Sequence, residues 1–97
     1  MIVHRPEGGG VRLALAGELD IATVPLPERH VGRALTRRPG HLLLDLAGVR
    51  FCDSTGVAAL IDAHTAAAAR HVALRVVNAN DITRRVMQIM GTLDALT

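Results

Sequence analysis

The stretch from Leu42 to Arg70 constrains the fold of this chain more than any other part of the sequence. It begins with an apolar run, Leu42 to Leu46, passes through a short polar break, Cys52 to Gly56, and continues with apolar residues at helical spacing. A leucine run without regular polar alternation is typical of a strand covered on both faces, and the later spacing is typical of a helix. The sequence therefore predicts a strand, a tight loop and a helix over residues 54 to 70.

Ser54 and Thr55 place two hydroxyl groups in this predicted loop, after a strand and before a helix. The first turn of a helix has free N–H groups and carries the positive end of the helix dipole. We expect chemistry on Ser54 to be exposed and to affect any protein that docks on the loop.

The amino-terminal third predicts a hairpin followed by a helix. Apolar residues alternate with other residues around residues 11 to 16, and the segment Glu7 to Gly10 has turn composition, so strands are expected at residues 1 to 5 and 11 to 16. Prolines flank the next segment and are tolerated only at the start of a helix, which predicts a helix over Leu26 to Thr36.

The carboxyl-terminal half predicts a crossover unit and one more helix. The predicted helix of residues 54 to 70 is followed by a strand at Val72 to Val77, and such crossovers make the two strands that they connect parallel. Asp81 is expected to cap a last helix that ends at Gly91. Together these elements predict a mixed α/β fold with a four-stranded sheet and helices packed on it.

Composition limits the class of protein. A chain of 97 residues suits one domain with a modest core, and because Phe51 is the sole aromatic residue, that core must consist of Leu, Val, Ile and Ala. No apolar run approaches the roughly 18 residues that span a bilayer, and the amino terminus lacks a signal-peptide pattern, so we expect a cytoplasmic protein without membrane insertion. With Cys52 as the single cysteine, no internal disulfide and no cysteine metal cluster can form.

The charge pattern does not favour nucleic acid. All eleven basic residues are arginines, but they are scattered, the net charge is only +2, and no aromatic residues are interleaved to stack on bases. We therefore expect no direct contact with nucleic acid.

The sequence also lacks the residue arrangements that common enzyme mechanisms need. Ser54 is outside a Gly-x-Ser-x-Gly elbow, and the histidines at positions 4, 30, 41, 64 and 71 are spread along the chain. Asp62 and His64 are two residues apart, so on a helix they point to different faces and form a poor metal pair. We expect no catalytic residue, no metal and no cofactor, and interpret Cys52 as a small buried apolar residue.

The polar break has more than one interpretation from its residues alone. Asp53 and Ser54 are both good helix N-caps, and capping by itself would explain either of them. Thr55 fits a buried β-branched residue that supports the turn. Gly56 fits either an ordinary glycine at a helix start or a close approach of a neighbouring strand or a partner.

Two blocks of the sequence resemble a known family. Residues 45 to 61, DLAGVRFCDSTGVAALI, resemble the core motif of STAS domains, particularly those of bacterial anti-sigma-factor antagonists. Residues 17 to 23, GELDIAT, resemble the family's GELD segment, which lies at about this distance upstream. The resemblance implies one STAS domain over residues 1 to 97, with a mixed sheet of four to five strands and helices mainly on one face.

The resemblance also implies a regulatory function. It assigns Ser54 as a phosphorylated serine, with Thr55 as the alternative acceptor and Asp20, Asp53 and Gly56 as its surroundings. From residues alone, Asp20 fits equally well as a cap or turn residue after the second strand. The implied protein is not an enzyme: its unphosphorylated form binds an anti-sigma factor and so releases a sigma factor.

By the same resemblance, that anti-sigma factor is a serine kinase that binds the ATP, and a phosphatase resets the switch. We expect the bulky negative phosphate to block the partner surface while the fold stays intact. Small residues follow the serine, which would let a partner approach closely, and the expected partner-binding residues are Ser54, Thr55, Gly56, Val57, Ala58, Ala59 and Asp62.

Two further expectations concern partners. Single STAS domains also serve as interaction subunits of ABC-type lipid-transport complexes, which is the alternative function for this chain. Family members usually continue past the counterpart of Gly91 with a short last strand, so a chain ending at Thr97 would leave an exposed sheet edge that predicts weak homodimerisation.

Overall fold

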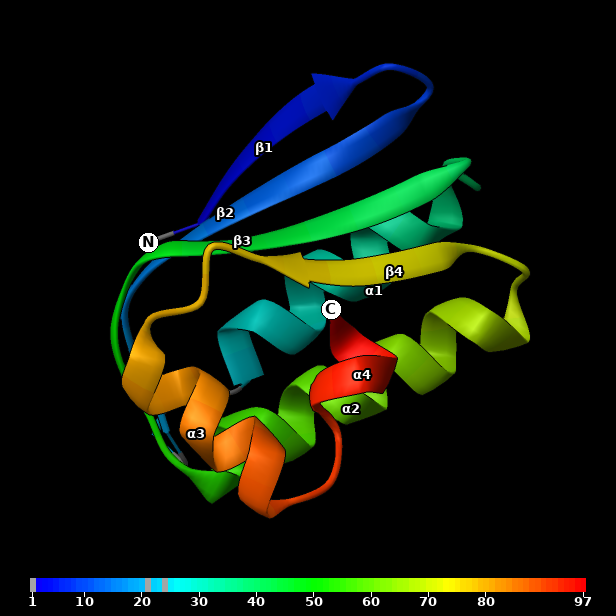
Figure 1. Cartoon of the computed structure of the whole chain (residues 1–97). Coiled ribbons are helices and arrows are strands. Elements are labelled where there is room, and N and C mark those ends of the chain that lie inside the picture. Colours follow the sequence, from blue (N-terminus) through cyan, green and yellow to red (C-terminus); the bar gives the residue numbers. More distant parts are fainter. Residues whose placement is uncertain (1, 21, 24) are drawn as a thin grey trace.

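The computed structural model describes residues 2–20, 22–23 and 25–97, and within them it has one four-stranded sheet with helices on one side (Figure 1). Predictions that fall on Met1, Ile21 and Val24 lie outside the described residues. In chain order the elements are β1 (Ile2–Glu7), β2 (Gly10–Leu19), α1 (Pro25–Thr36), β3 (His41–Cys52), α2 (Ser54–Ala69), β4 (Ala73–Val77), α3 (Asp81–Ile89) and α4 (Leu93–Leu96).

The sheet has the order β1-β2-β3-β4 and is mixed, as predicted. The hairpin of β1 and β2 is antiparallel and turns at Gly8 and Gly9, whose positive φ angles of 51° and 90° suit glycine. The pairs β2–β3 and β3–β4 are parallel, so α2 forms the expected crossover between β3 and β4. The types and order of these elements were predicted correctly, but β3 is much longer than predicted and α4 was not predicted.

The prediction that the leucine run is covered on both faces is wrong. Leu42, Leu44 and Leu46 are 0–1% exposed and face the helices, whereas Leu43 and Asp45 are half-buried on the opposite face, which none of the helices in the described part of the chain covers (Figure 1). Leu43 pairs in register with Arg12 of β2 and Arg75 of β4. Long arginine side chains can cover apolar surface with their methylene groups, which accounts for a leucine on this open face.

Asp45 joins three parts of the open face. Its Oδ2 accepts a bond of 2.8 Å from Arg12 Nη1, and its Oδ1 accepts bonds from the Ala47 N–H at 2.9 Å and from Asn78 Nδ2 at 3.1 Å. Burial alone would raise the pKa of this carboxyl, but the three bonds and the arginine charge outweigh it, so the pKa of Asp45 lies below its usual value.

We expect Asp45→Asn to change how the free energy of unfolding depends on pH in acidic solution. A carboxyl whose pKa is lower in the folded state stabilises the fold above its unfolded pKa of about 4, and loses that contribution as pH falls through the folded pKa. Urea unfolding between about pH 6 and pH 2 should show the wild type losing its advantage over Asp45→Asn as the solution becomes acidic. An advantage that is unchanged at low pH would contradict this role.

Asn80, and not Asp81 as predicted, caps α3. Its Oδ1 accepts a bond of 2.8 Å from the Thr83 N–H, and its Nδ2 donates to the carbonyl oxygens of Val49 and Arg50 at 3.3 and 3.5 Å. Asp81 is instead the first residue of the helix. The cap therefore fixes the start of α3 against the end of β3 as well as closing its first turn.

Replacing the cap residue Asn80 should lower the free energy of unfolding more than replacing the neighbouring Asp81 does. We expect Asn80→Ala to lower the free energy of unfolding by about 1–2 kcal/mol, because it removes the cap and the bonds to β3. The matched control is Asp81→Ala, which removes only a favourable charge from the first turn and should cost less. Urea unfolding of both variants measures the difference, and an equal or reversed order would show that the cap is assigned to the wrong residue.

Candidate functional site: the junction of β3 and α2

A single residue, Asp53, separates β3 from α2, and it caps the helix. Its backbone is extended, with φ of −95° and ψ of −171°, and its Oδ1 accepts a bond of 2.9 Å from the Gly56 N–H. Its carbonyl oxygen accepts the first helical bond, from the Val57 N–H at 3.0 Å. Of the two cap candidates in the sequence, Asp53 is the cap and Ser54 is the first residue of α2.

Gly56 is a glycine because the neighbouring strand leaves no room for a side chain. A Cβ atom at this position would overlap the carbonyl oxygen of Leu19 at the end of β2 and the sulfur of Cys52. The first turn of α2 therefore lies directly against the end of β2. This contact selects the close approach of a neighbouring strand from the interpretations that the sequence left open.

Ser54 and Thr55 are both exposed. No described residue forms a hydrogen bond with the Ser54 side chain, so its hydroxyl is available at the positive end of α2. The interpretation of Thr55 as a buried turn residue is wrong, because its side chain projects from the first turn without being packed.

Asp20 holds the turn that follows β2. Its Oδ1 accepts bonds from the Ala22 N–H at 3.0 Å and the Thr23 N–H at 3.2 Å, while its own N–H donates to the Thr23 hydroxyl at 2.9 Å. It directly follows Leu19, which pairs in register with Cys52, and Asp53 directly follows Cys52. The two carboxylates therefore occur at the same edge of the sheet, and Asp20 is both a turn residue and a neighbour of the junction.

Cys52 is buried beside the junction, as expected. Burial, and after it the negative charge of Asp53, raise the pKa of the Cys52 thiol to about 11. The thiol is therefore protonated at neutral pH, which makes it a poor nucleophile and a poor redox sensor.

The expected partner-binding residues divide into two groups. Ser54, Thr55, Ala58 and Asp62 are exposed, whereas Gly56, Val57 and Ala59 are buried. The exposed group follows the outer face of α2 from its first residue onward. Only this group can present side chains to another protein.

Sequence reasoning missed two exposed apolar residues beside the junction. Phe51 is 48% exposed and Ile82 is 65% exposed, and the bonds of Asn80 to the carbonyl oxygens of Val49 and Arg50 place the start of α3 against the strand end that carries Phe51. Phe51 could have been found, because it is the only aromatic residue and it immediately precedes the polar break. The exposure of Ile82 depends on which face of α3 packs inward.

The fold also brings two distant histidines together. The Nε2 atom of His4 on β1 and the Nδ1 atom of His30 on α1 are 2.6 Å apart. Burial lowers the pKa of His30, and the charges of His4 and Arg33 lower it further.

Within residues 2–20, 22–23 and 25–97 there is no group of three or more His, Cys, Asp or Glu side chains that could hold a metal ion. In the same described part of the chain, no helix is long and apolar enough to cross a membrane.

Comparisons with known proteins place the chain in a family. The family model described as "Mlab, STAS domain" matches residues 3–97. The anti-sigma-F factor antagonist RsfB of Mycobacterium tuberculosis is 32% identical over 79 residues, which cover 81% of this chain and 64% of RsfB. The chain thus spans slightly less than two thirds of the length of this curated relative.

Solved structures share the fold. A crystal structure of an anti-sigma factor antagonist from Mycobacterium paratuberculosis matches with a TM-score of 0.88 and 24% identity, over 99% of this chain and 81% of that one. The Bacillus cell fate determinant SpoIIAA in its phosphorylated form matches with a TM-score of 0.76 and 20% identity, over 99% of this chain and 87% of that one. With a family model that matches residues 3–97 and a fold shared along the chain, this protein belongs to the STAS domain family.

Proposed function

We propose that this STAS domain is an anti-sigma-factor antagonist that phosphorylation of Ser54 switches off. The observation that carries the proposal is the exposed Ser54 hydroxyl, which makes no side-chain hydrogen bond to the described residues; Ser54 begins α2 and is followed by the exposed residues Thr55, Ala58 and Asp62. A relative that is 32% identical is named as an anti-sigma-F factor antagonist, and a protein with the same fold is known in a phosphorylated form. The partner is an anti-sigma factor that is itself a serine kinase.

In the proposed reaction, this domain supplies only the acceptor and the docking surface. The Ser54 oxygen attacks the γ-phosphorus of ATP bound by the kinase, the bond to the β,γ-bridging oxygen breaks, and ADP leaves. The serine proton passes to a base on the kinase. Hydrolysis by a phosphatase returns the free hydroxyl and inorganic phosphate, so the domain needs no cofactor of its own.

A phosphate on Ser54 would leave the fold intact and change the surface. It adds about −1.5 to −2 charges at the first turn of a helix, where N–H groups and the helix dipole favour an anion. The Asp53 carboxylate stays engaged with the Gly56 N–H, so the cap does not need to move. We therefore expect α2 to keep its position while the junction becomes strongly negative.

The docking surface explains why this change would release a partner. Phe51 is exposed at the end of β3, three residues before Ser54, and Ile82 is exposed at the start of α3, which Asn80 bonds to the same strand; Ala58 is exposed one turn along α2. A partner that covers these side chains would also cover Ser54. A buried phosphate without a cationic partner has a large desolvation cost, and the Asp20 and Asp53 carboxylates at the same edge of the sheet add repulsion.

The first test identifies the acceptor. We expect incubation with ATP and the cognate kinase to add the mass of one phosphate to the wild type and to Thr55→Ala, and none to Ser54→Ala. Intact-mass spectrometry measures this for each candidate anti-sigma kinase. Phosphate that persists on Ser54→Ala and disappears from Thr55→Ala would move the acceptor to Thr55.

The second test locates the docking surface. Ala58→Arg should weaken binding of the anti-sigma factor by at least about tenfold, because it inserts a long charged side chain into the covered surface. Ala68→Arg is the matched control, since Ala68 is also exposed on α2 but lies far from Ser54. Calorimetric titration measures both affinities, and thermal melting confirms that both variants fold. Equal affinities would place the docking surface elsewhere on the domain.

The second candidate function is that of an interaction subunit of an ABC-type lipid-transport complex. The exposed Phe51 and Ile82 would suit such a partner equally well. The two functions differ in their use of the serine. Stable binding to a transporter ATPase that is unaffected by Ser54→Ala, together with no phosphate from any anti-sigma kinase, would favour the transport complex.

A further inference from the structure

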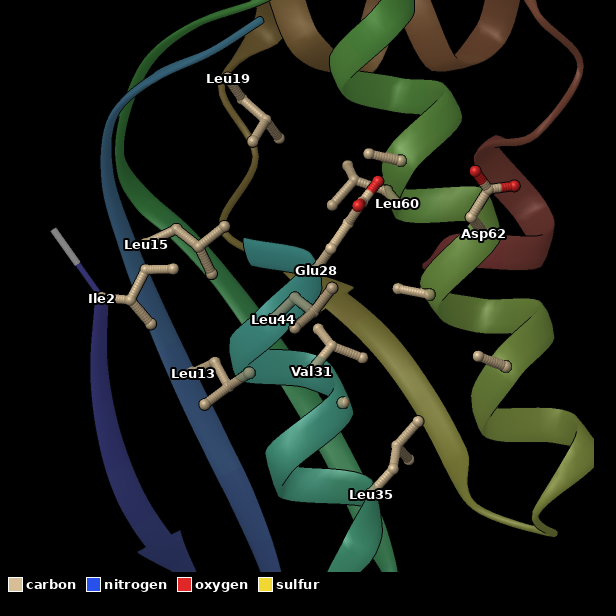
Figure 2. A pocket seen from close by; sticks show the side chains of 14 residues that line it. Ile2, Leu13, Leu15, Leu19, Glu28, Val31, Leu35, Leu44, Leu60 and Asp62 are labelled. Carbon is tan, nitrogen blue, oxygen red and sulfur yellow. The ribbon is translucent and has the colours of Figure 1, made fainter. Parts of the chain in front are cut away.

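An apolar cavity of about 220 Å³ lies between α1 and α2, over the helix-facing side of the sheet (Figure 2). Its floor comes from β2 and β3, and its walls come from the two helices. Most of the lining is aliphatic, including Leu13, Leu15, Val31, Leu44 and Leu60. Most of this cavity lies behind α2 as seen from the exposed residues Ser54, Thr55 and Ala58, and Asp62 is the one expected partner-binding residue on the outer face that also reaches the cavity lining.

Small residues on both helices create the space. Gly32 of α1 and Ala59, Ala63 and Ala66 of α2 all line the cavity. Small residues on facing helices often permit close packing, but a Cβ atom at Gly32 would have no neighbour within 4 Å. A glycine inside a helix lowers helix stability relative to alanine, and here close packing does not explain it. The missing side chain instead leaves room beside the cavity.

The size and the lining suit a small apolar molecule. An apolar cavity of about 150 Å³ remains dry and takes up benzene, because water finds no hydrogen-bond partners in it. The present cavity is larger and opens to solvent beside exposed lining residues such as Glu28 and Gly32, so it has room for an aromatic ring with a short alkyl chain whose polar end stays in water.

Two carboxylates at the cavity favour a ligand with a positive charge. Glu28 on α1 and Asp62 on α2 are the acidic side chains of the lining, and both are exposed. Figure 2 shows Glu28 extending from α1 towards the α2 side of the cavity. Neither carboxylate forms an ion pair with a described residue, whereas Asp45 on the open face is paired with Arg12. A ligand with a positive end would supply the charge that the rim lacks.

We propose that the space between α1 and α2 is a binding site for a small amine that has an apolar aryl or alkyl body. The body enters the aliphatic cavity, and the ammonium group stays at the rim beside Glu28, while Asp62 adds negative charge from the outer side of α2. The proposal depends on the cavity and its rim, and it holds whether or not Ser54 is phosphorylated.

The test uses three probes of similar shape: 4-phenylbutylamine, 4-phenylbutyrate and butylbenzene. We expect saturable binding of the amine to the unmodified protein, measured by calorimetry and by amide chemical-shift changes on α1 and α2. Because the carboxylates are exposed and screened by solvent, the preference for amine over carboxylate should be modest, about fivefold. No saturable binding of the amine, or equal binding of the carboxylate, would overturn the proposal.

Variants locate the site. Ala63→Leu fills the cavity and should weaken amine binding by at least about tenfold, while Ala68→Leu, the same change at an exposed position of α2, should not. Gly32→Leu fills the cavity from the other wall and serves as the test if Ala63→Leu does not fold. The pair Glu28→Gln and Asp62→Asn should remove the preference for the amine and leave butylbenzene binding unchanged. Unaltered amine binding in a folded cavity-filling variant would place the ligand elsewhere and overturn the proposal.

Discussion

The contact between the start of α2 and the end of β2 determines where the candidate switch lies. Gly56 has no side chain because the Leu19 carbonyl and the Cys52 sulfur occupy the space, and the Asp53 N–H donates to the same Leu19 carbonyl at 3.4 Å. The end of β2, the junction residue Asp53 and the first turn of α2 therefore meet at the Leu19 carbonyl group. The contacts of Asp53 and Gly56 fix the backbone on both sides of Ser54 while the Ser54 side chain is exposed, which suits a residue that a partner must reach without disturbing the fold.

Because the helices cover only one face of the sheet, the two faces are stabilised differently. On the covered face, aliphatic side chains of β2, β3 and β4 pack beneath α1 and α2. On the open face, Asp45 connects Arg12, Asn78 and the Ala47 N–H through hydrogen bonds. The proposed docking surface and the cavity both involve α2: the first lies on its outer side near Ser54, the second lies against α1, and Asp62 belongs to both.

Some parts of the site could be predicted from local sequence and others could not. The loop, its serine and its glycine followed from the polar break and from the resemblance to STAS domains. The choice between Asp53 and Ser54 as the cap could not be made, because both residue types cap well and the backbone angles decide. At α3 the sequence prediction chose Asp81 and was wrong, because Asn80 caps equally well by residue type and its extended backbone makes it the cap. Ala58 and Ala59 are adjacent alanines of the same helix, so residue type does not distinguish them, yet Ala58 is exposed and Ala59 is buried and lines the cavity.

By itself, the sequence determined the order and type of the main elements and the mixed sheet, because these depend on residue spacing and on turn residues that act locally, and two of its motifs resembled those of the STAS family. Only the tertiary structure decided which side of each helix is exposed, that Asp20 and Asp53 share an edge of the sheet, and that α1 and α2 leave a cavity between them. These features depend on how segments far apart in the chain pack, and a local sequence pattern does not determine the distance between two packed helices.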